Sequence, residues 1–202
     1  MIDLVDYGGG NIGSIQRCLE RLQIPYQMTD GNALPSGDRP LVFPGVGAFG
    51  ASINHLTQSG LLPRLKSIVQ SGTPYLGICI GLQVLFDSSE EAEGLKGLGV
   101  IPGKVVKFDA KKVSKIPQIG WNHIAPPTNS TFTEEPTGHV YFVNSFHPSP
   151  EDPAMVLYEA NYSGQFCAAV KHQNITAFQF HPEKSGPFGH QLIQRWHNNY
   201  AL

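Results

Sequence analysis

The sequence predicts an α/β fold built on a doubly wound, mostly parallel sheet. Two observations indicate this fold. Through the first half of the chain, short apolar strands alternate with amphipathic helices, which is typical of parallel strands joined by crossover helices. In the second half, several strands are separated by short turns only, which favours antiparallel hairpins. At 202 residues we expect a single domain over 1–202, with the hairpins confined to its C-terminal half.

The first half contains four expected strands with helices between them. The strands are predicted at residues 2–6, 26–28, 41–43 and 74–78. Helices are predicted from the capping residue Asn11 onward, over 48–58, over 61–70, and after Cys79, where Leu82, Leu85 and Phe86 recur at helical spacing.

The second half is predicted to be rich in strands and to end in a helix. The strands are expected at residues 100–108, 140–146, 155–160, 166–172 and 176–180. The closing helix is expected at 188–200, with Leu192, Ile193 and Trp196 facing inward.

Composition argues against several classes of protein. The formal net charge is −2 and no basic run is interleaved with aromatic residues, so nucleic-acid binding is not expected. No apolar run reaches membrane-spanning length and no signal sequence is recognised, so we expect a cytoplasmic protein. The chain has three cysteines, of which Cys18 and Cys167 are expected in the core, and no disulfide framework is predicted.

The segment Gly77-Ile78-Cys79-Ile80-Gly81 predicts a reactive cysteine. A buried strand precedes Cys79 and a helical pattern follows it, with a glycine two residues away on either side. This is the pattern of a nucleophile elbow, in which glycines allow a sharp strand-to-helix turn and keep side chains away from the nucleophile. The first turn of the helix also favours the thiolate through the helix dipole.

A cysteine nucleophile needs a base, and His181 is the best candidate among eight histidines. It ends an apolar strand, which places it at the same sheet edge as the elbow, and Glu183 lies close enough in sequence to orient its ring. His147 also follows an apolar strand but lacks a neighbouring carboxylate. A zinc site from Cys79, His147 and His181 is disfavoured because no ligand pair has the usual spacing, so no metal is expected.

Stabilisation of an oxyanion requires hydrogen-bond donors near the nucleophile. The backbone N–H of Ile80, the residue after Cys79, is one expected donor. The second is expected from Val46 or Gly47, because the glycines on both sides of Val46 let its peptide turn over freely. The alternative interpretation of this segment is an ordinary glycine-rich turn between strand and helix.

A competing motif near the N-terminus is the pattern Gly8-x-Gly10-x-x-Gly13, which matches the dinucleotide-binding fingerprint and has Asp30 at a suitable distance. The pattern is short, the chain is rich in glycine, and Asp6 and Tyr7 separate the strand from the first glycine. We therefore favour the cysteine chemistry and expect no cofactor.

Three segments together resemble the triad, or class-I, glutamine amidotransferases. They are Pro44–Gly47, Gly77–Gln83 and Phe178–Glu183. Three further segments look like the glutaminase subunits of imidazole glycerol phosphate synthases, and these are Asp6–Asn11, Gly120–Asn122 and His181–Ser185. The resemblance follows the expected order over essentially the whole chain, and it implies a flavodoxin-like sheet.

The resemblance implies a mechanism and a substrate. Cys79 would attack the side-chain amide of glutamine, with His181 as acid and base and Glu183 orienting it, so that a thioester forms and ammonia is released. It also implies that glutamine is held near five residues, namely Gly47, Gln83, Glu91, Ser145 and Phe146. The family more often has histidine and tyrosine where this chain has Asn144 and Phe146, so the role of a tyrosine hydroxyl there is in doubt.

The resemblance further implies a heterodimer with a (β/α)8-barrel cyclase that uses the ammonia in histidine biosynthesis. By position, the residues that face this partner would be Asn11, Ser14, Gln118, Trp121 and Lys184, although core packing is an equal alternative for Trp121. Three other functions stay open: ammonia supply to a different acceptor such as a sugar nucleotide, hydrolysis of peptides, and a non-catalytic binding subunit.

Overall fold

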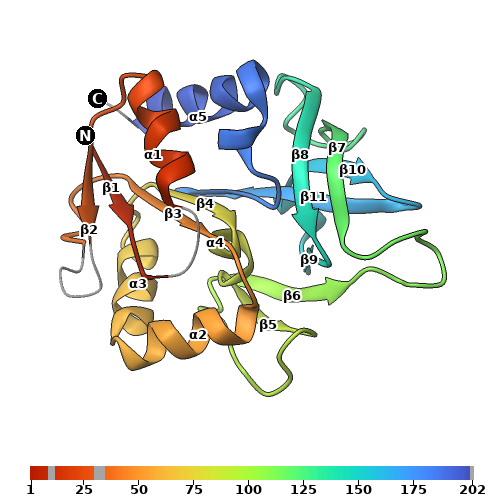
Figure 1. The fold of residues 1–202 in the computed structure, drawn as a ribbon, viewed down its shortest axis with the longest axis horizontal. Helices are drawn as coiled ribbons and strands as arrows, with labels where there is room; N and C mark the ends of the chain where they lie inside the picture. The colour runs from red at the N-terminus through yellow and green to blue at the C-terminus, as the bar shows by residue number, and fades with distance from the viewer. Residues whose placement is uncertain (9–11, 30–34, 201–202) are drawn as a thin grey trace.

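The structure is a computed structural model that describes residues 1–8, 12–29 and 35–200. In this part of the chain, a nine-stranded sheet has the order β2-β1-β3-β4-β12-β11-β10-β7-β8, and a three-stranded sheet has the order β5-β6-β9. Helices α1 and α5 cover one face of the large sheet, whereas α2 and α3 cover the other (Figure 1). The predicted α/β class is confirmed.

The strands of the large sheet are β1 (Ile2–Val5), β2 (Tyr26–Thr29), β3 (Leu41–Gly45), β4 (Tyr75–Cys79), β7 (Gln118–Ala125), β8 (Gly138–Asn144), β10 (Val156–Asn161), β11 (Gln165–His172) and β12 (Ile175–Phe178). The small sheet contains β5 (Phe86–Ser89), β6 (Ile101–Lys107) and β9 (Phe146–Pro150). The helices are α1 (Ile12–Arg21), α2 (Phe49–Gln58), α3 (Leu61–Gln70), α4 (Ile80–Gln83) and α5 (Gly186–Tyr200), with short 3-10 turns η1 (Pro153–Met155) and η2 (Pro182–Lys184). Within the described residues, no helix is long and apolar enough to cross a membrane.

The direction of the strands divides the large sheet into two parts. Strands β2, β1, β3, β4 and β12 are parallel, whereas β11, β10, β7 and β8 continue the sheet through antiparallel pairs. The antiparallel part lies in the C-terminal half, as predicted. In the parallel part, Gly45 pairs with Cys79 and Ile78 with Phe178, so the carboxyl ends of β3, β4 and β12 meet at one edge.

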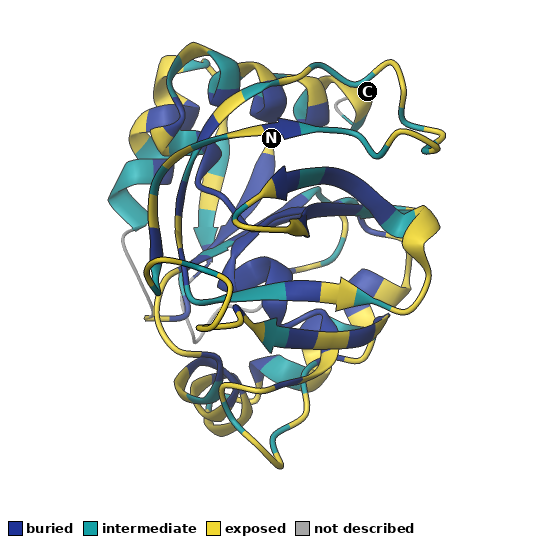
Figure 2. Cartoon of the chain, turned by 90° about the vertical axis from the view of Figure 1, so that its right-hand side faces the viewer, coloured by how far each residue is buried: buried dark blue, intermediate teal, exposed yellow. Residues whose placement is uncertain are grey.

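The core lies on both faces of the large sheet. One apolar cluster packs between the sheet and the face of α1 and α5, and includes Ile15 and Leu192. A second cluster lies against α2 and α3, and includes Ile53 and Leu65. Figure 2 shows the buried central strands surrounded by elements with exposed outer faces. Burial on both faces explains why the central strands read as continuous apolar runs.

The predicted core cysteines are confirmed. Cys18 on α1 and Cys167 on β11 are both buried and free. Burial raises the pKa of Cys18 to about 11 and raises that of Cys167 further. Both side chains are therefore neutral thiols that pack as small apolar groups.

The segment after Cys79 differs most from the sequence prediction. The helix ends at Gln83, and Phe86 begins a strand although its spacing predicts a helix. The reason is tertiary hydrogen bonding: the N–H of Leu98 donates to the carbonyl of Val84, and that of Gly99 donates to Phe86. Contacts made by a segment more than ten residues away thus override local helix propensity.

Other boundaries also differ from the prediction. The expected strand 140–146 is divided at Ser145 into β8 and β9, which belong to different sheets. The expected strand 176–180 ends at Phe178, so the residues before His181 form a bend. Strands β5 and β7 were not predicted. The polar residues of β7 conceal the alternation that its burial pattern reveals, whereas β5, with two exposed residues between two buried ones, has no alternation to detect.

Candidate active site

Cys79 occupies the turn between β4 and α4. Its backbone has φ 55° and ψ −103°, a conformation outside the usual regions for a residue with a side chain. Such a conformation costs on the order of 1–3 kcal/mol and persists only where the surrounding structure imposes it. Cys79 is 7% exposed and lies at the carboxyl edge of the parallel strands. The turn therefore has the geometry expected of a nucleophile elbow.

The two glycines that flank this turn are required by close backbone packing. A Cβ at Gly81 would overlap the carbonyl oxygen of Phe43 on the neighbouring strand. A Cβ at Gly77 would overlap the carbonyl of Gly81 itself. Any side chain at either position would therefore push β3, β4 and α4 apart and move Cys79.

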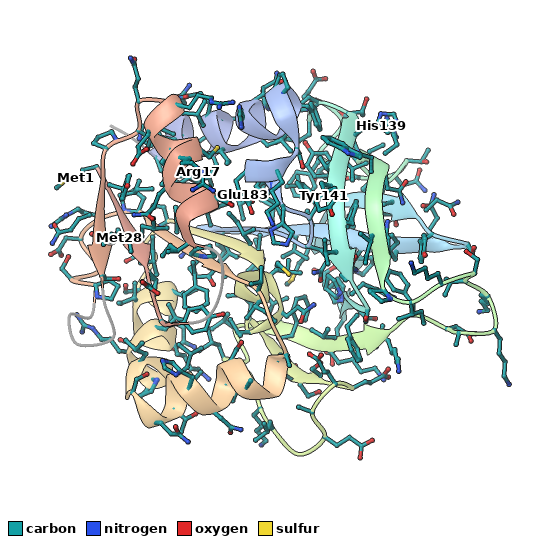
Figure 3. All side chains as sticks on the ribbon, viewed as in Figure 1. Met1, Arg17, Met28, His139, Tyr141 and Glu183 are labelled. Carbon is teal, nitrogen blue, oxygen red and sulfur yellow. The ribbon has the colours of Figure 1, made fainter. Side chains whose placement is uncertain are left out.

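His181 and Glu183 lie beside the elbow. The Nδ1 atom of His181 is 2.8 Å from Oε1 of Glu183, and both side chains are nearly buried, at 4% and 6% exposure. Turn η2, which carries Glu183, packs against α1 and β8, and Figure 3 shows the labelled Glu183 between these elements. A carboxylate on Nδ1 leaves Nε2 of the same ring to face another partner.

Backbone and hydroxyl hydrogen bonds fix the position of His181. Its N–H donates to the carbonyl of Tyr141 on β8 at 2.9 Å. The hydroxyl of Ser185 donates to the carbonyl of His181 at 2.6 Å and accepts from the N–H of Tyr141 at 2.9 Å. Ser185 is 2% exposed. It thus locks the bend after β12 to β8, which gives Ser185 a structural role that its position in the sequence did not reveal.

The two neighbours of His181 determine its charge. Burial alone would lower the pKa of His181, but hydrogen bonds to Cys79 and Glu183 and the negative charge on both raise it to about 10. The folded pKa lies above the ordinary value of 6.5, so the charged imidazolium contributes its full stabilisation below about pH 6.5. This contribution is lost as the pH rises through about 10.

A cavity of about 300 Å³ opens above the thiol. Its walls come from six parts of the chain: the loop after β3, the elbow with α4, the segment after β5, the residue before β7, the end of β8 with the start of β9, and the bend at His181. The lining residues are Val46, Gly47, Cys79, Ile80, Gln83, Glu91, Pro117, Val143, Asn144, Ser145, Phe146, His181 and Lys184. This volume suits a ligand the size of an amino acid.

Comparison with known proteins identifies the family. The model of the glutamine amidotransferase class-I family matches residues 3–199. The chain is 40% identical to an imidazole glycerol phosphate synthase subunit HisH from Rhodopirellula baltica, over 97% of this chain and 96% of that protein. It is also 40% identical to the HisH subunit of Geobacillus kaustophilus, over 100% and 96% of the two chains. The chain is a class-I glutamine amidotransferase of the HisH group.

Two further similarities of this amidotransferase are to a longer protein and to a solved structure. It is 42% identical to the chloroplastic imidazole glycerol phosphate synthase hisHF of Arabidopsis thaliana, over 97% of this chain but 34% of that longer protein. A crystal structure of a glutamine amidotransferase matches with a TM-score of 0.75 at 17% identity, over all of both chains. The similarity to this crystal structure supports the fold alone, because the identity is only 17%.

Replacing Glu183 with glutamine is expected to lower the pKa of His181 by at least about one unit, because a charged hydrogen-bond acceptor becomes a neutral one. We also expect roughly a 10²–10³-fold loss of glutaminase turnover, since the tautomer and orientation of the ring are no longer fixed. A histidine ¹³C NMR titration measures the first effect. The control is Glu135→Gln, which removes a carboxylate paired with Lys171 and Arg195. If this variant changed the pKa of His181 by the same amount, Glu183 would not be the residue that raises it.

The residues expected to provide oxyanion donors lie around the thiol. Val46, Gly47 and Ile80 all line the cavity. Gly47 has φ +125° and nothing lies within 4 Å of the position its Cβ would take, so its peptide has room to rotate. Gly45, in contrast, packs against the hydroxyl of Tyr7 and the Cβ of Ile80. Movement of this loop would therefore be confined to the residues after Gly45.

The expected substrate contacts also line the cavity, but several of their polar atoms already have partners. Oε2 of Glu91 accepts from the N–H of Phe49 at 2.7 Å. The carbonyl of Ser145 accepts from the N–H of Phe108 at 3.1 Å. The carbonyl of Phe146 accepts from Nδ2 of Asn144 at 3.0 Å. Asn144 thus fixes the turn between β8 and β9.

The residues expected at a partner interface are divided by the structure. Trp121 is 58% exposed, which rejects the core-packing alternative, and Lys184 is also exposed. Ser14 is half-buried on α1, and Asn11 lies outside the described residues. The expectation that Gln118 faces outward is wrong, because it is 3% exposed. Side chains alternate along β7, so the outward positions are the odd-numbered ones.

His147, the competing histidine, is separate from this site. His147 packs against the rings of Phe108 and Phe166, and burial lowers its pKa. It therefore belongs to an aromatic cluster of this amidotransferase and does not line the cavity. The central residues of the glycine fingerprint, and Asp30, lie outside the described residues.

Gln179, a neighbour of Cys79 beside the cavity, was not predicted from the sequence. Gln179 is fully buried, and its Nε2 lies 3.7 Å from Sγ of Cys79. Its Oε1 accepts from Nε2 of Gln83 at 3.0 Å. The only available signal was a polar residue inside the apolar run before His181, and that signal alone does not distinguish a solvent-facing strand position from a buried amide.

Proposed function

We propose that this chain is the glutaminase subunit of an imidazole glycerol phosphate synthase and hydrolyses glutamine through a thioester on Cys79. The observation that carries the proposal is the strained elbow at Cys79, which opens on the cavity beside the buried His181–Glu183 pair. Membership of the HisH group supports the choice of glutamine and of histidine biosynthesis.

The reaction divides into two steps at one sulfur atom. Sγ of Cys79 attacks the carboxamide carbon of glutamine, and the resulting tetrahedral intermediate breaks its C–N bond. His181 gives its proton to the leaving nitrogen, so that ammonia departs and a glutamyl thioester remains. Water then attacks the thioester while His181 takes its proton, which releases glutamate and restores the thiolate. The raised pKa of His181 is consistent with an imidazolium that starts the cycle as an acid.

The oxyanion of each tetrahedral intermediate needs two donors. The N–H of Ile80 is at the start of α4, where it has no partner within the helix. The Val46–Gly47 peptide supplies the second donor when its N–H points into the cavity. Because Gly47 has open space around it, binding of a partner protein on this loop can set that orientation.

The exposed apolar side chains beside the cavity mouth support a partner surface at this place. Val46, Ile119, Trp121 and Val143, here called the apolar rim, are 37–58% exposed. Ile119 pairs directly with Val143 across β7 and β8, and Val46 and Val143 both line the cavity. A (β/α)8-barrel cyclase seated on this rim would receive ammonia directly from the cavity and keep it from solvent.

A glutaminase assay with and without the cognate cyclase and its ribonucleotide substrate tests the proposal. We expect little hydrolysis by the isolated chain and strong stimulation when both are present. If the cyclase left the rate of hydrolysis unchanged but a partner that amidates a sugar nucleotide raised it, a different acceptor for the ammonia would be favoured. Preference for peptides over free glutamine would refute the amidotransferase mechanism.

Replacing Trp121 with alanine is expected to weaken binding of the cyclase about 30-fold, or about 2 kcal/mol, because large aromatic anchors concentrate binding energy. Isothermal titration with the cyclase measures the change. Gln70→Ala, at the exposed end of α3 on the other side of the sheet, is the control and should bind as the unmodified chain does. If both variants bound the cyclase with equal affinity, the interface would not include the apolar rim.

A further inference from the structure

Gln179 is a buried amide between the expected nucleophile and a residue of the cavity wall. It follows β12 directly, and its N–H donates to the carbonyl of Ala168 at 2.8 Å, which holds the backbone in place. Its side chain connects Cys79 to Gln83 through two hydrogen bonds. Nε2 of Gln83 donates to Oε1 of Gln179 at 3.0 Å, and Nε2 of Gln179 donates to Sγ of Cys79 at 3.7 Å. Neither step of the proposed chemistry uses this side chain.

The direction of both amides follows from the contact with Cys79, which the proposed mechanism requires to react as a thiolate. A thiolate only accepts hydrogen bonds, so the amide group of Gln179 must turn its NH₂ toward Cys79. The carbonyl oxygen of Gln179 then faces Gln83, whose NH₂ group must donate to it. The carbonyl oxygen of Gln83 is thereby left for the cavity that this residue lines. Flipping either amide would set two acceptors or two donors against each other.

We propose that Gln179 is a positioning residue with two effects. It stabilises the thiolate of Cys79, and it orients Gln83 so that the cavity presents a carbonyl acceptor to the NH₂ of the substrate carboxamide. This inference rests on the proposed glutaminase function and extends it to substrate selection. Since Gln179 is 0% exposed, its own contact is with Cys79 and Gln83, and it acts on the substrate through them.

An acceptor at this point separates glutamine from glutamate. The carboxamide of glutamine can donate to the Gln83 carbonyl, whereas the carboxylate of glutamate brings only acceptors. A site built for a donor rejects an analogue that lacks it, because a buried polar group is left unpaired. The same mismatch arises as soon as the thioester is hydrolysed, so the orientation of Gln83 also favours release of the product.

Two variants separate the two effects of Gln179. Gln179→Met removes both the donor to Cys79 and the acceptor for Gln83, while keeping a side chain of similar length. Gln179→Glu removes the donor but keeps an acceptor for Gln83 Nε2. The control is Asn174→Asp, the same amide-to-acid change near the opposite end of β12, where Nδ2 donates to the carbonyls of Val69 and Thr73.

The first experiment measures the rate of Cys79 alkylation by iodoacetamide against pH, on the full chain. In both Gln179 variants, we expect the midpoint of this profile to rise by about one pH unit, since the thiolate loses a donor. The control should keep the original profile. An unchanged midpoint in both Gln179 variants would overturn the thiolate role. Because alkylation requires no glutamine, this result is independent of whether the proposed function is correct.

The second experiment measures glutamine kinetics and glutamate inhibition in the complex with the cyclase. Gln179→Met should raise KM for glutamine about 10-fold and strengthen inhibition by glutamate, because Gln83 is free to flip. Gln179→Glu should lower kcat but leave KM within about threefold, because Gln83 keeps its partner. Equal changes of KM in both variants would overturn the orienting role. If the unmodified complex hydrolyses no glutamine, the proposed function fails instead.

Discussion

Replacing Cys79 with alanine should abolish glutamine-dependent synthesis in the complex while leaving ammonia-dependent synthesis intact. Removal of a nucleophile costs up to roughly 10⁶-fold in turnover in comparable enzymes, so we expect a loss of at least about 10⁴-fold. The cyclase would be unaffected because its substrate site belongs to the other chain. Parallel assays of the complex with glutamine and with ammonium chloride measure both effects.

The control for this prediction is Cys18→Ala. Cys18 is also buried and free, but it packs on α1 within the apolar core. We expect its replacement to lower stability slightly, with both activities retained. If Cys79→Ala removed both activities equally, Cys79 would not be a nucleophile for glutamine alone. If Cys18→Ala removed the glutamine-dependent activity, a buried core thiol would have to take part in the reaction.

Sequence reasoning succeeded where the local pattern and the tertiary structure agree. The parallel strands are buried on both faces, so their apolar runs predicted them well. The segments at Cys79 and at His181–Glu183 were predictable because each carries its geometry locally, through flanking glycines and a strand end. Sheet topology then brings them together, since β12 pairs directly with β4.

Sequence reasoning failed where a distant segment decides the structure. Strand β5 exists because it pairs with β6 and because residues near Gly97 hydrogen-bond to it, and no pattern within the strand shows this. Gln118 was placed at the partner interface by the resemblance alone. The alternation along β7, which buries Gln118 and exposes Trp121, was not seen because this strand was not predicted. The place of Gln179 between Cys79 and Gln83 depends on the bend after β12, which was expected to be a regular strand.

Replacing Gly81 with alanine should destabilise the protein by about 3 kcal/mol and reduce glutaminase activity more than 10-fold. Local propensity predicts the opposite change in stability: Gly81 lies in α4 with a negative φ, where alanine is favoured by about 1 kcal/mol. The loss therefore comes only from overlap of the new Cβ with the Phe43 carbonyl, a backbone atom held within β3. Urea unfolding followed by tryptophan fluorescence measures the change.

The matched control is Gly60→Ala, which isolates the cost of backbone conformation. Gly60 precedes α3 with φ +71°, and nothing lies within 4 Å of the position its Cβ would take. Its replacement should cost about 1–2 kcal/mol, the penalty of the left-handed conformation, and leave activity unchanged. Gly81→Ala should exceed this loss and also displace Cys79 relative to His181, because the sulfur and the clash share one turn. Equal losses in the two variants, with activity retained in both, would mean that the elbow tolerates a side chain and that its glycines do not position the nucleophile.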